Sequence, residues 1–213
     1  MDPIAGIRKN YQMRSLAEAD TAADPLEQFG RWWEEALASN IDEVNAMTLA
    51  TADPAGKPSA RIVLLKGLKR EGFEFFTNYE SHKALEMAAN DHVALVFFWK
   101  ELQRQVRIEG TVSKTTSSVS DEYFNSRPRE SRIGAWSSPQ SHTIPSREML
   151  DERVTASEKR FEGKEEIPRP DFWGGYIVNP RKIEFWQGRP NRLHDRIEYV
   201  LENGGWIKKR LAP

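Results

Sequence analysis

The stretch that decides the fold is AMTLATADPAGKPSARIVLLKGLKREGFEFFT, residues 46–77. From Ala46 to Ala52 apolar and polar residues alternate with a period of two, which is typical of a β-strand. The next four residues, Asp53 to Gly56, have turn chemistry. Further strands are predicted over 59–66 and 73–77. Strand, turn, strand in close succession indicates antiparallel pairing.

Downstream, the same period of two predicts strands over 92–99, 104–112, 175–179, 182–187, 196–201 and 206–211. Helices are predicted over 81–90, with Ser81 as its N-cap, over 117–125 and over 146–161. Many short strands joined by short loops, with a few helices added, predict a mainly β protein built on an antiparallel barrel.

The first helix is predicted to begin at residue 25. Asp24 is a suitable cap, Pro25 suits the first turn, and Glu27 completes a pattern like a capping box. Its predicted buried stripe is Leu26, Phe29, Trp33 and Leu37. Residues 1–23 are polar and aperiodic, which predicts a mobile N-terminal arm, and residues 24–213 form one domain because no linker or repeat divides them.

Composition excludes several classes of function. The chain has 31 basic and 32 acidic residues and a net charge of -1, which argues against a sequence-independent nucleic-acid binder. There is no cysteine for thiol catalysis, and the four histidines show no metal-ligand spacing. No apolar run approaches the ~20 residues needed to span a bilayer, and the first residues lack a signal-peptide pattern. We therefore expect a cytoplasmic protein with no bound metal, nucleic acid or membrane.

Four stretches combine positive charge with features suited to an anionic, planar ligand. The most concentrated is WQGRPNRLHDR, residues 186–196, which contains three arginines, a histidine and a tryptophan. In RIVLLK, residues 61–66, an ideal strand would place Arg61, Val63 and Leu65 on one face and Ile62, Leu64 and Lys66 on the other. The alternative for 186–196 is a core tryptophan with arginines on a solvated edge strand, and for 61–66 it is a core strand with cations at its fraying ends.

The other two stretches flank predicted helices. In TNYESHK, residues 77–83, a strand leads into a helix N-terminus, which can bind an anion. In YFNSRPRESR, residues 123–132, Tyr123 and Arg127 share a helical face and Pro128 is predicted to end the helix, leaving Arg129, Ser131 and Arg132 on a loop. A simple surface role is the alternative for each. Together the four stretches indicate two phosphate sites and a stacking surface without a nucleophile, as in enzymes whose cofactor performs the chemistry.

These motifs, together with FWGG at 172–175 and RLAP at 210–213, closely resemble those of the pyridoxamine 5'-phosphate oxidase family, from about Arg8 to Pro213. The resemblance implies an FMN-binding split β-barrel of antiparallel Greek-key type, working as a homodimer with FMN at the subunit interface. The implied FMN-binding residues are Arg61, Ile62, Val63, Leu64, Leu65, Lys66, Phe76, Thr77, His82, Lys83, Gln105, Gln140, Ser141, Trp186 and Arg196, the last four from the second subunit.

The resemblance also implies the substrate site. Lys66, Tyr123, Arg127 and Ser131 would bind the substrate phosphate, Arg192, Leu193 and His194 would lie over the pyridine ring, and Arg8, Lys9, Asn10 and Tyr11 would close over the site. Arg192 and His194 are the catalytic candidates, with the role of proton transfer left open between them. The dipeptide His194-Asp195 is not interpreted as a dyad, because neighbours on a strand face opposite ways.

The implied reaction oxidises pyridoxamine or pyridoxine 5'-phosphate to pyridoxal 5'-phosphate. A hydride passes from C4' to flavin N5, O2 reoxidises the flavin with release of hydrogen peroxide, and the amine-derived imine hydrolyses to ammonia. Two alternatives are a split-barrel flavin reductase and a non-enzymatic carrier of flavin or pyridoxal phosphate. One departure from the family pattern is His82, where the family often has arginine; a histidine contact would be weaker or pH-dependent.

Overall fold

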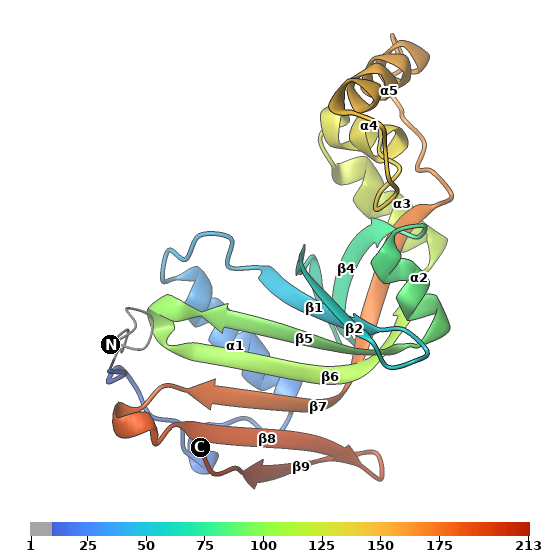
Figure 1. The fold of residues 1–213 in the computed structure, drawn as a ribbon. Coiled ribbons are helices and arrows are strands. Elements are labelled where there is room, and N and C mark those ends of the chain that lie inside the picture. Colours follow the sequence, from blue (N-terminus) through green and yellow to red (C-terminus); the bar gives the residue numbers. More distant parts are fainter. Residues whose placement is uncertain (1–9) are drawn as a thin grey trace, which may run out of the picture.

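The computed structural model describes residues 10–213, which form a curled antiparallel sheet with helices at one end (Figure 1). Its strands are β1 (Ala46–Ala52), β2 (Pro58–Leu64), β3 (Gly67–Lys69), β4 (Gly72–Asn78), β5 (His92–Trp99), β6 (Arg104–Lys114), β7 (Trp173–Gln187), β8 (Asp195–Glu202) and β9 (Gly205–Arg210). The order β2-β1-β5-β6-β7-β4-β3 forms the main path, and β8 and β9 extend from β7. The predicted antiparallel β architecture is confirmed.

The long strand β7 makes the sheet curl into a split barrel. Its first half pairs with β4, its second half pairs with β8, and β6 lies along both halves. The sequence predicted two separate strands here, over 175–179 and 182–187. The strand continues past Pro180 through a β-bulge: Glu109 pairs with Lys182 and Gly110 with Pro180, which leaves Arg181 of β7 as the extra residue. The two strands approach closely here, since a Cβ on Gly110 would lie 2.1 Å from the Asn179 carbonyl oxygen.

Helix α1 (Pro25–Leu37) packs across the inner face of the sheet. Asp24 accepts hydrogen bonds from the main-chain N–H groups of Leu26 and Glu27, which confirms it as the cap, whereas the Glu27 carboxylate pairs with Arg31. The predicted buried stripe is partly wrong: Leu37 is 48% exposed, and the buried positions are Pro25, Gln28, Phe29, Trp32 and Ala36. The stripe is rotated because the helix presents Trp32 to Phe185 of β7 as well as Phe29 to Phe73 of β4.

The remaining helices are α2 (His82–Ala89), α3 (Ser117–Ser126), α4 (Arg129–Ser137) and α5 (Arg147–Arg160). Ser81 occupies the N-cap position of α2, but its hydroxyl donates to the Asn78 carbonyl and caps no amide. The loop predicted after Pro128 is wrong, because Arg129, Ser131 and Arg132 lie on α4. A proline disrupts the helix before it but suits the start of the next one.

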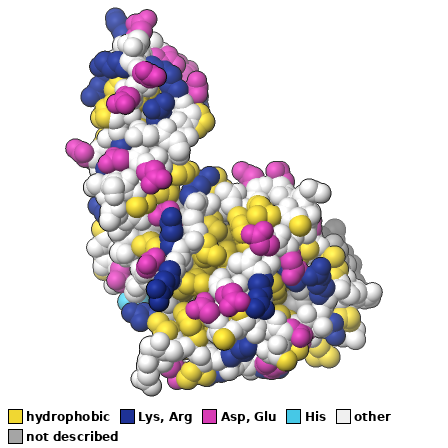
Figure 2. All heavy atoms as spheres, turned by 180° about the vertical axis from the view of Figure 1, so that it is seen from behind, with side chains coloured by type: hydrophobic (Ala, Val, Ile, Leu, Met, Phe, Trp, Pro, Cys, Tyr) yellow, Lys and Arg dark blue, Asp and Glu magenta, His cyan; other side chains and the backbone are white. Residues whose placement is uncertain are grey.

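Helices α3, α4 and α5 project from one end of the sheet, and Figure 2 shows the projection from behind with many charged side chains on its surface. They enclose a second apolar cluster of Phe124, Ile133, Phe161, Ile167 and Trp173, separate from the main core between α1 and the sheet. Trp173 therefore joins the start of β7 to the helical projection.

Part of the predicted arm, residues 10–23, lies against the barrel. Leu16 is 5% exposed and its amide donates to Asp195, while Gln12 donates its amide to Gln103. A short 3-10 helix, Glu18–Asp20, follows, and Glu18 pairs with Arg210 of β9. Arg8 and Lys9 lie outside the described residues. Across residues 10–213 no helix has the length and apolar character needed to cross a bilayer.

Candidate functional site

A cavity of about 290 Å³ opens between β2, β4, α2 and α3; we call it the β2–α3 cavity. Its lining residues are Ile62, Val63, Leu64, Lys66, Phe76, Thr77, Asn78, Lys83, Tyr123, Arg127, Gln140 and Trp173. An adjoining cavity of about 260 Å³ shares Arg127 and adds Ser131. The family resemblance implied all these residues except Asn78 and Trp173 as ligands of FMN or of the substrate phosphate. Folding brings them together from segments as distant in the chain as Ile62 and Trp173.

One wall of the β2–α3 cavity is a stack of three nearly parallel aromatic rings. The Phe76 and Tyr123 ring centres lie 3.9 Å apart at 21°, and the Tyr123 and Trp173 planes differ by 7°. These side chains come from β4, α3 and β7, so three separate elements are needed to build the wall. Such a wall offers flat apolar surface to a conjugated ring.

Arg127 carries positive charge into both cavities. Its guanidinium carbon lies 4.6 Å from the Trp173 ring centre, and its buried Nη1 has no hydrogen-bond partner among residues 10–213. Burial lowers the pKa of Arg127, an effect that Tyr123 opposes. A buried donor without a partner is costly, and an anionic oxygen in the cavity would satisfy it.

Lys83, in the first turn of α2, supplies a second cation. Its Nζ donates to Gln140 Oε1 at 3.0 Å, to Thr77 Oγ1 at 3.2 Å and to Ser81 Oγ at 3.3 Å. These partners are neutral, and no ion pair of the described residues includes Lys83, Lys66 or Arg127. Burial, followed by repulsion from Arg61, lowers the pKa of Lys83. The cavity therefore holds cations without internal counter-charges, which suits a phosphorylated ligand.

Arg61 lies behind the cavity wall. Its guanidinium donates to Thr51 Oγ1 at 2.5 Å and lies 3.3 Å from the carboxylate of Glu86, which is 7% exposed. The alternating exposure of β2 up to Val63 agrees with the predicted division into two faces, but that division does not separate the residues that line the cavity. Val63 lines the cavity together with Ile62 and Leu64, whereas Leu65, past the end of β2, is buried in the core.

Three other predicted residues have different surroundings. His82 is exposed, with Nε2 3.6 Å from Glu86 Oε1 on the next turn of α2. Gln140, expected from a second subunit, contacts Lys83 of its own chain. Ser141 is exposed in the loop after Gln140 with a φ of 70° and does not line the cavity.

A second group of predicted residues lies where β7 ends and β8 begins. The Trp186 and His194 ring centres are 4.5 Å apart, and Tyr11 lies 5.8 Å from Trp186. Gln105 is the register partner of Trp186 on β6, and Arg196 opposes Trp186 on β8, where it pairs with Glu184. Figure 1 places this region at the opposite end of the sheet from α2 and α3, so one chain does not bring the two groups together.

The loop between these strands carries the catalytic candidates. Arg192 is exposed and its φ is 63°, directly after Asn191 with a φ of 56°. Left-handed backbone at two successive residues other than glycine is strained, and such strain is often found at functional sites. Leu193 is 68% exposed, and His194 is half-buried against Trp186.

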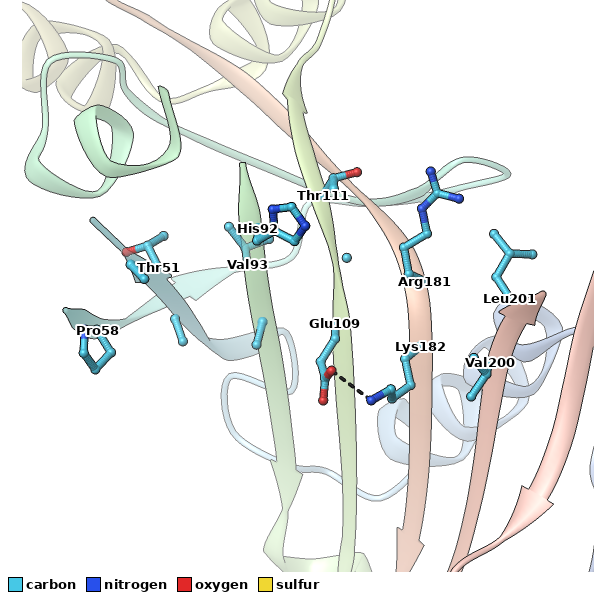
Figure 3. A pocket seen from close by; sticks show the side chains of 14 residues that line it. Thr51, Pro58, His92, Val93, Glu109, Thr111, Arg181, Lys182, Val200 and Leu201 are labelled. Atoms are coloured by element: carbon cyan, nitrogen blue, oxygen red, sulfur yellow. Dashed lines mark ion pairs between the residues drawn. The ribbon is translucent and has the colours of Figure 1, made fainter. Parts of the chain in front are cut away.

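A further cavity of about 690 Å³ lies on the outer face of the sheet and was not anticipated from the sequence (Figure 3). Its floor is formed by small side chains such as Ala50, Ala52 and Ala94, and one edge by the ion pair of Lys182 with Glu109 at 3.1 Å. None of its lining residues belongs to the predicted site. The cavity belongs to an apolar surface of the sheet that also includes the exposed side chains of Phe98 and Ile62.

Sequence reasoning also missed Trp173 and Glu86 as parts of the site. Trp173 was within the FWGG motif, so its position was signalled but its role beneath Arg127 was not. Glu86 belongs to no sequence motif, and its contact with Arg61 becomes visible only in the fold. Within residues 10–213 no group of three histidine, aspartate or glutamate side chains is arranged to hold a metal ion.

Comparison with known proteins agrees with this geometry. The family described as "Pyridoxamine 5'-phosphate oxidase" matches residues 33–160, and its "C-terminal dimerisation region" matches residues 173–213. A pyridoxine/pyridoxamine 5'-phosphate oxidase of Rubrobacter xylanophilus is 55% identical over 99% of this chain and 96% of its own. One from Polynucleobacter asymbioticus is 54% identical over 100% of both chains.

Solved structures show the same fold. PhzG from Burkholderia lata, in complex with tetrahydrophenazine-1-carboxylic acid, superimposes with a TM-score of 0.89 at 25% identity, covering 96% of this chain and 100% of that one. An FMN-binding protein from Nostoc punctiforme related to pyridoxamine 5'-phosphate oxidase gives a TM-score of 0.68 at 16% identity, covering 94% of this chain and 100% of its own. Fold and cavity together define a split-barrel flavoprotein that uses FMN.

Within that class, the chain belongs to the pyridoxamine 5'-phosphate oxidase family. The match covers both the split barrel and the C-terminal strands.

Proposed function

We propose that this protein oxidises pyridoxamine 5'-phosphate and pyridoxine 5'-phosphate to pyridoxal 5'-phosphate, with O2 as the acceptor, in the cytoplasm. The observation that carries the proposal is Arg127, whose buried Nη1 finds no hydrogen-bond partner within residues 10–213 and lies beside an aromatic wall. A phosphate oxygen would satisfy that donor, and a planar ring would stack on the wall. The full-length relatives named as pyridoxine/pyridoxamine 5'-phosphate oxidases support the same reaction.

The residues of the β2–α3 cavity fit FMN. Lys83 offers an unneutralised ammonium to the phosphate, β2 borders the cavity with Ile62, Val63 and Leu64, and Thr77 adds a hydroxyl. Arg61 would act from behind this wall, held by Glu86. When bound, FMN supplies the N5 atom that accepts a hydride. The protein's own residues orient the ligands and exclude water, since no described residue has the environment of an activated nucleophile.

The substrate phosphate is assigned to Tyr123, Arg127 and Ser131, with Lys66 at the mouth of the cavity. Ser131 faces the adjoining cavity on α4, one turn after the end of α3 that carries Arg127. This phosphate cluster distinguishes the proposal from a flavin reductase, which would need a nicotinamide or deazaflavin donor. A passive carrier would bind the same ligands without converting them, whereas an oxidase converts substrate to product.

A second copy of the chain would complete the site. We assign Gln105, Trp186 and Arg196 to the FMN site of the partner, because these residues lie at the far end of the sheet from the β2–α3 cavity. The apolar outer face, with Ile62 65% exposed and Phe98 53% exposed, is suited to burial in a dimer. The match of residues 173–213 to a dimerisation region supports this arrangement.

Mixed dimers test the shared site. Lys83→Ala and Arg196→Ala would damage opposite halves of one site, so a dimer with one chain of each kind would retain one intact site. We expect such heterodimers, purified with two tags, to regain about half of the wild-type FMN binding and turnover. Recovery no greater than in either homodimer would show that both residues serve the same chain.

The reaction itself is tested by the visible spectrum of the FMN-loaded protein. Anaerobic addition of pyridoxamine 5'-phosphate should bleach the flavin band, and air should restore it with formation of pyridoxal 5'-phosphate. Bleaching by NADPH alone would favour the reductase. A flavin that stays oxidised with every vitamer would favour the carrier.

A further inference from the structure

The loop from Gly188 to His194 is fixed by main-chain contacts. The Gly188 amide donates to the Gln103 carbonyl at 2.8 Å, and the Leu193 amide donates to the Pro190 carbonyl at 3.1 Å. Gly188 lies directly under the Tyr11 ring, since a Cβ there would be 2.7 Å from that ring. These contacts confine the two strained residues, Asn191 and Arg192, to the outer bend of the loop.

Within this loop the His194 ring accepts a hydrogen bond. The main-chain N–H of Arg189 donates to His194 Nδ1 at 3.0 Å. A main-chain N–H can only donate, so Nδ1 must present its lone pair and carry no proton. Because a neutral imidazole has a single N–H, that hydrogen must be on Nε2.

The surroundings of His194 disfavour a second proton. Trp186 from β7 and Tyr11 from the N-terminal segment pack against the ring and bring no ionised group. The charged neighbours are Arg192 and Arg189 on the loop; burial, followed by repulsion from Arg192, lowers the pKa of His194.

The carboxylate of the neighbouring residue, Asp195, is occupied by other partners. It accepts from the Leu16 amide at 3.0 Å and pairs with Arg210 at 2.9 Å and with Arg189 at 3.4 Å. No hydrogen bond or ion pair of the described residues joins it to His194. The loop therefore supplies neither a counter-ion nor a proton acceptor for a charged imidazole.

We propose that the main-chain N–H of Arg189 holds His194 as the neutral Nε2–H tautomer, so that His194 is a hydrogen-bond donor to the substrate and does not transfer a proton. This inference rests on the proposed function only for the identity of the acceptor, an electron-rich oxygen of the substrate. Arg192, whose guanidinium is permanently charged, would then stabilise negative charge beside a neutral donor. The proton that the substrate releases would then be accepted by water or by another group of the substrate.

The tautomer can be measured without turnover. In FMN-loaded protein labelled with 15N-histidine, only four histidines contribute, and the His194 signals are identified by their loss in His194→Gln. We expect a protonated, pyrrole-like Nε2 and an unprotonated, pyridine-like Nδ1 between pH 6 and 8.5. A proton on Nδ1, or a doubly protonated ring near pH 7, would overturn the proposal.

Two substitutions separate donation from proton transfer. His194→Gln can place an amide N–H near the former Nε2, whereas His194→Asn reaches only the former Nδ1 position. We expect flavin reduction within about fivefold of wild type for H194Q and about 5- to 150-fold slower for H194N, as for a lost donor to a buried polar group.

The pH profile completes the test. A step in the reduction rate that is present in the wild type and absent in H194Q would assign proton transfer to His194 and overturn the proposal, as would equal rates for both variants. If the wild type itself reduces no flavin, the proposed function fails while the NMR result still decides the tautomer. Melting temperatures and bound FMN establish that both variants are folded.

Discussion

Arg127 lies over Trp173, with its guanidinium carbon 4.6 Å from the indole ring centre, and this contact couples the helical projection to the start of β7. Arg127 follows the last residue of α3, where its backbone is extended, and Trp173 begins β7 after the 12-residue segment that follows α5. The indole holds the cation in place, and no described residue hydrogen-bonds its Nη1. A selective anion site requires a cation that is held in one orientation and has a hydrogen-bond donor free for the ligand, and Arg127 combines the two.

Arg127→Ala should weaken the binding of the phosphorylated substrate more than that of FMN. Loss of a charge-assisted hydrogen bond of about 1.5–3 kcal/mol corresponds to about 10- to 150-fold in affinity. Titrations of the flavin spectrum with pyridoxal 5'-phosphate and of apoprotein with FMN would measure the two affinities. Arg147→Ala, on the exposed surface of α5, is the control. Equal loss of both ligands would contradict the assignment of Arg127 to the substrate.

Trp173→Leu should raise KM for the phosphorylated substrate about 2- to 30-fold, because the cation–π contact that orients Arg127 contributes about 0.5–2 kcal/mol. Trp173→Phe keeps an aromatic face and should recover most of the effect. Steady-state kinetics of the two variants give the comparison, with kcat as the internal reference. A KM unchanged in Trp173→Leu would remove Trp173 as a positioning residue.

Arg192→Ala should chiefly slow flavin reduction, since its guanidinium is proposed to polarise the substrate ring. Stopped-flow absorbance under anaerobic conditions measures that step directly. Arg147→Ala, at an exposed arginine of α5 remote from the loop, is the control. A reduction rate equal to that of the wild type would take Arg192 out of the catalytic set.

His82→Arg should tighten FMN binding. The planar guanidinium of arginine offers paired donors to a phosphate, which an imidazole does not. Fluorescence quenching of FMN provides the affinities. Leu85→Arg adds the same charge at another exposed position of α2 and serves as the control. The same gain in both variants would indicate a general effect of charge on α2.

Glu86 should contribute stability that is lost in acid. Burial raises its pKa, but hydrogen bonds from Ser59 and Thr51, attraction by His82 and the Arg61 contact outweigh burial, so the pKa is lowered. A carboxylate with a lowered folded-state pKa stabilises the protein above the unfolded value of about 4.3, and this contribution disappears as pH falls through the folded value.

Glu86→Gln should therefore lower the free energy of unfolding by about 1–3 kcal/mol at pH 7. The difference from the wild type should shrink as the pH falls from about 5 toward 3. Urea unfolding across that range measures both quantities. A difference that stays constant with pH would mean that the Glu86 charge does not contribute.

Local pattern was sufficient for much of this protein. Strands 46–52 and 92–99 were predicted with the bounds observed, and the Asp24 cap and the antiparallel β class are confirmed. Alternation and capping depend on neighbouring residues, so the chain specifies them without tertiary contacts. The motif resemblance also led to the family and to ten of the twelve residues lining the β2–α3 cavity.

The tertiary structure decided which segments far apart in the chain contact one another. The α1 stripe rotated toward Trp32 because both β4 and β7 meet that helix, and β7 stayed continuous because a bulge at Arg181 accommodates Pro180. Only the fold places Trp173 beneath Arg127 and Glu86 behind Arg61. The sequence by itself determined the local elements and the family, since these depend on short-range chemistry. The curl of the sheet decided which charges are neutralised and which remain free for a ligand, because that depends on contacts between residues far apart in the chain.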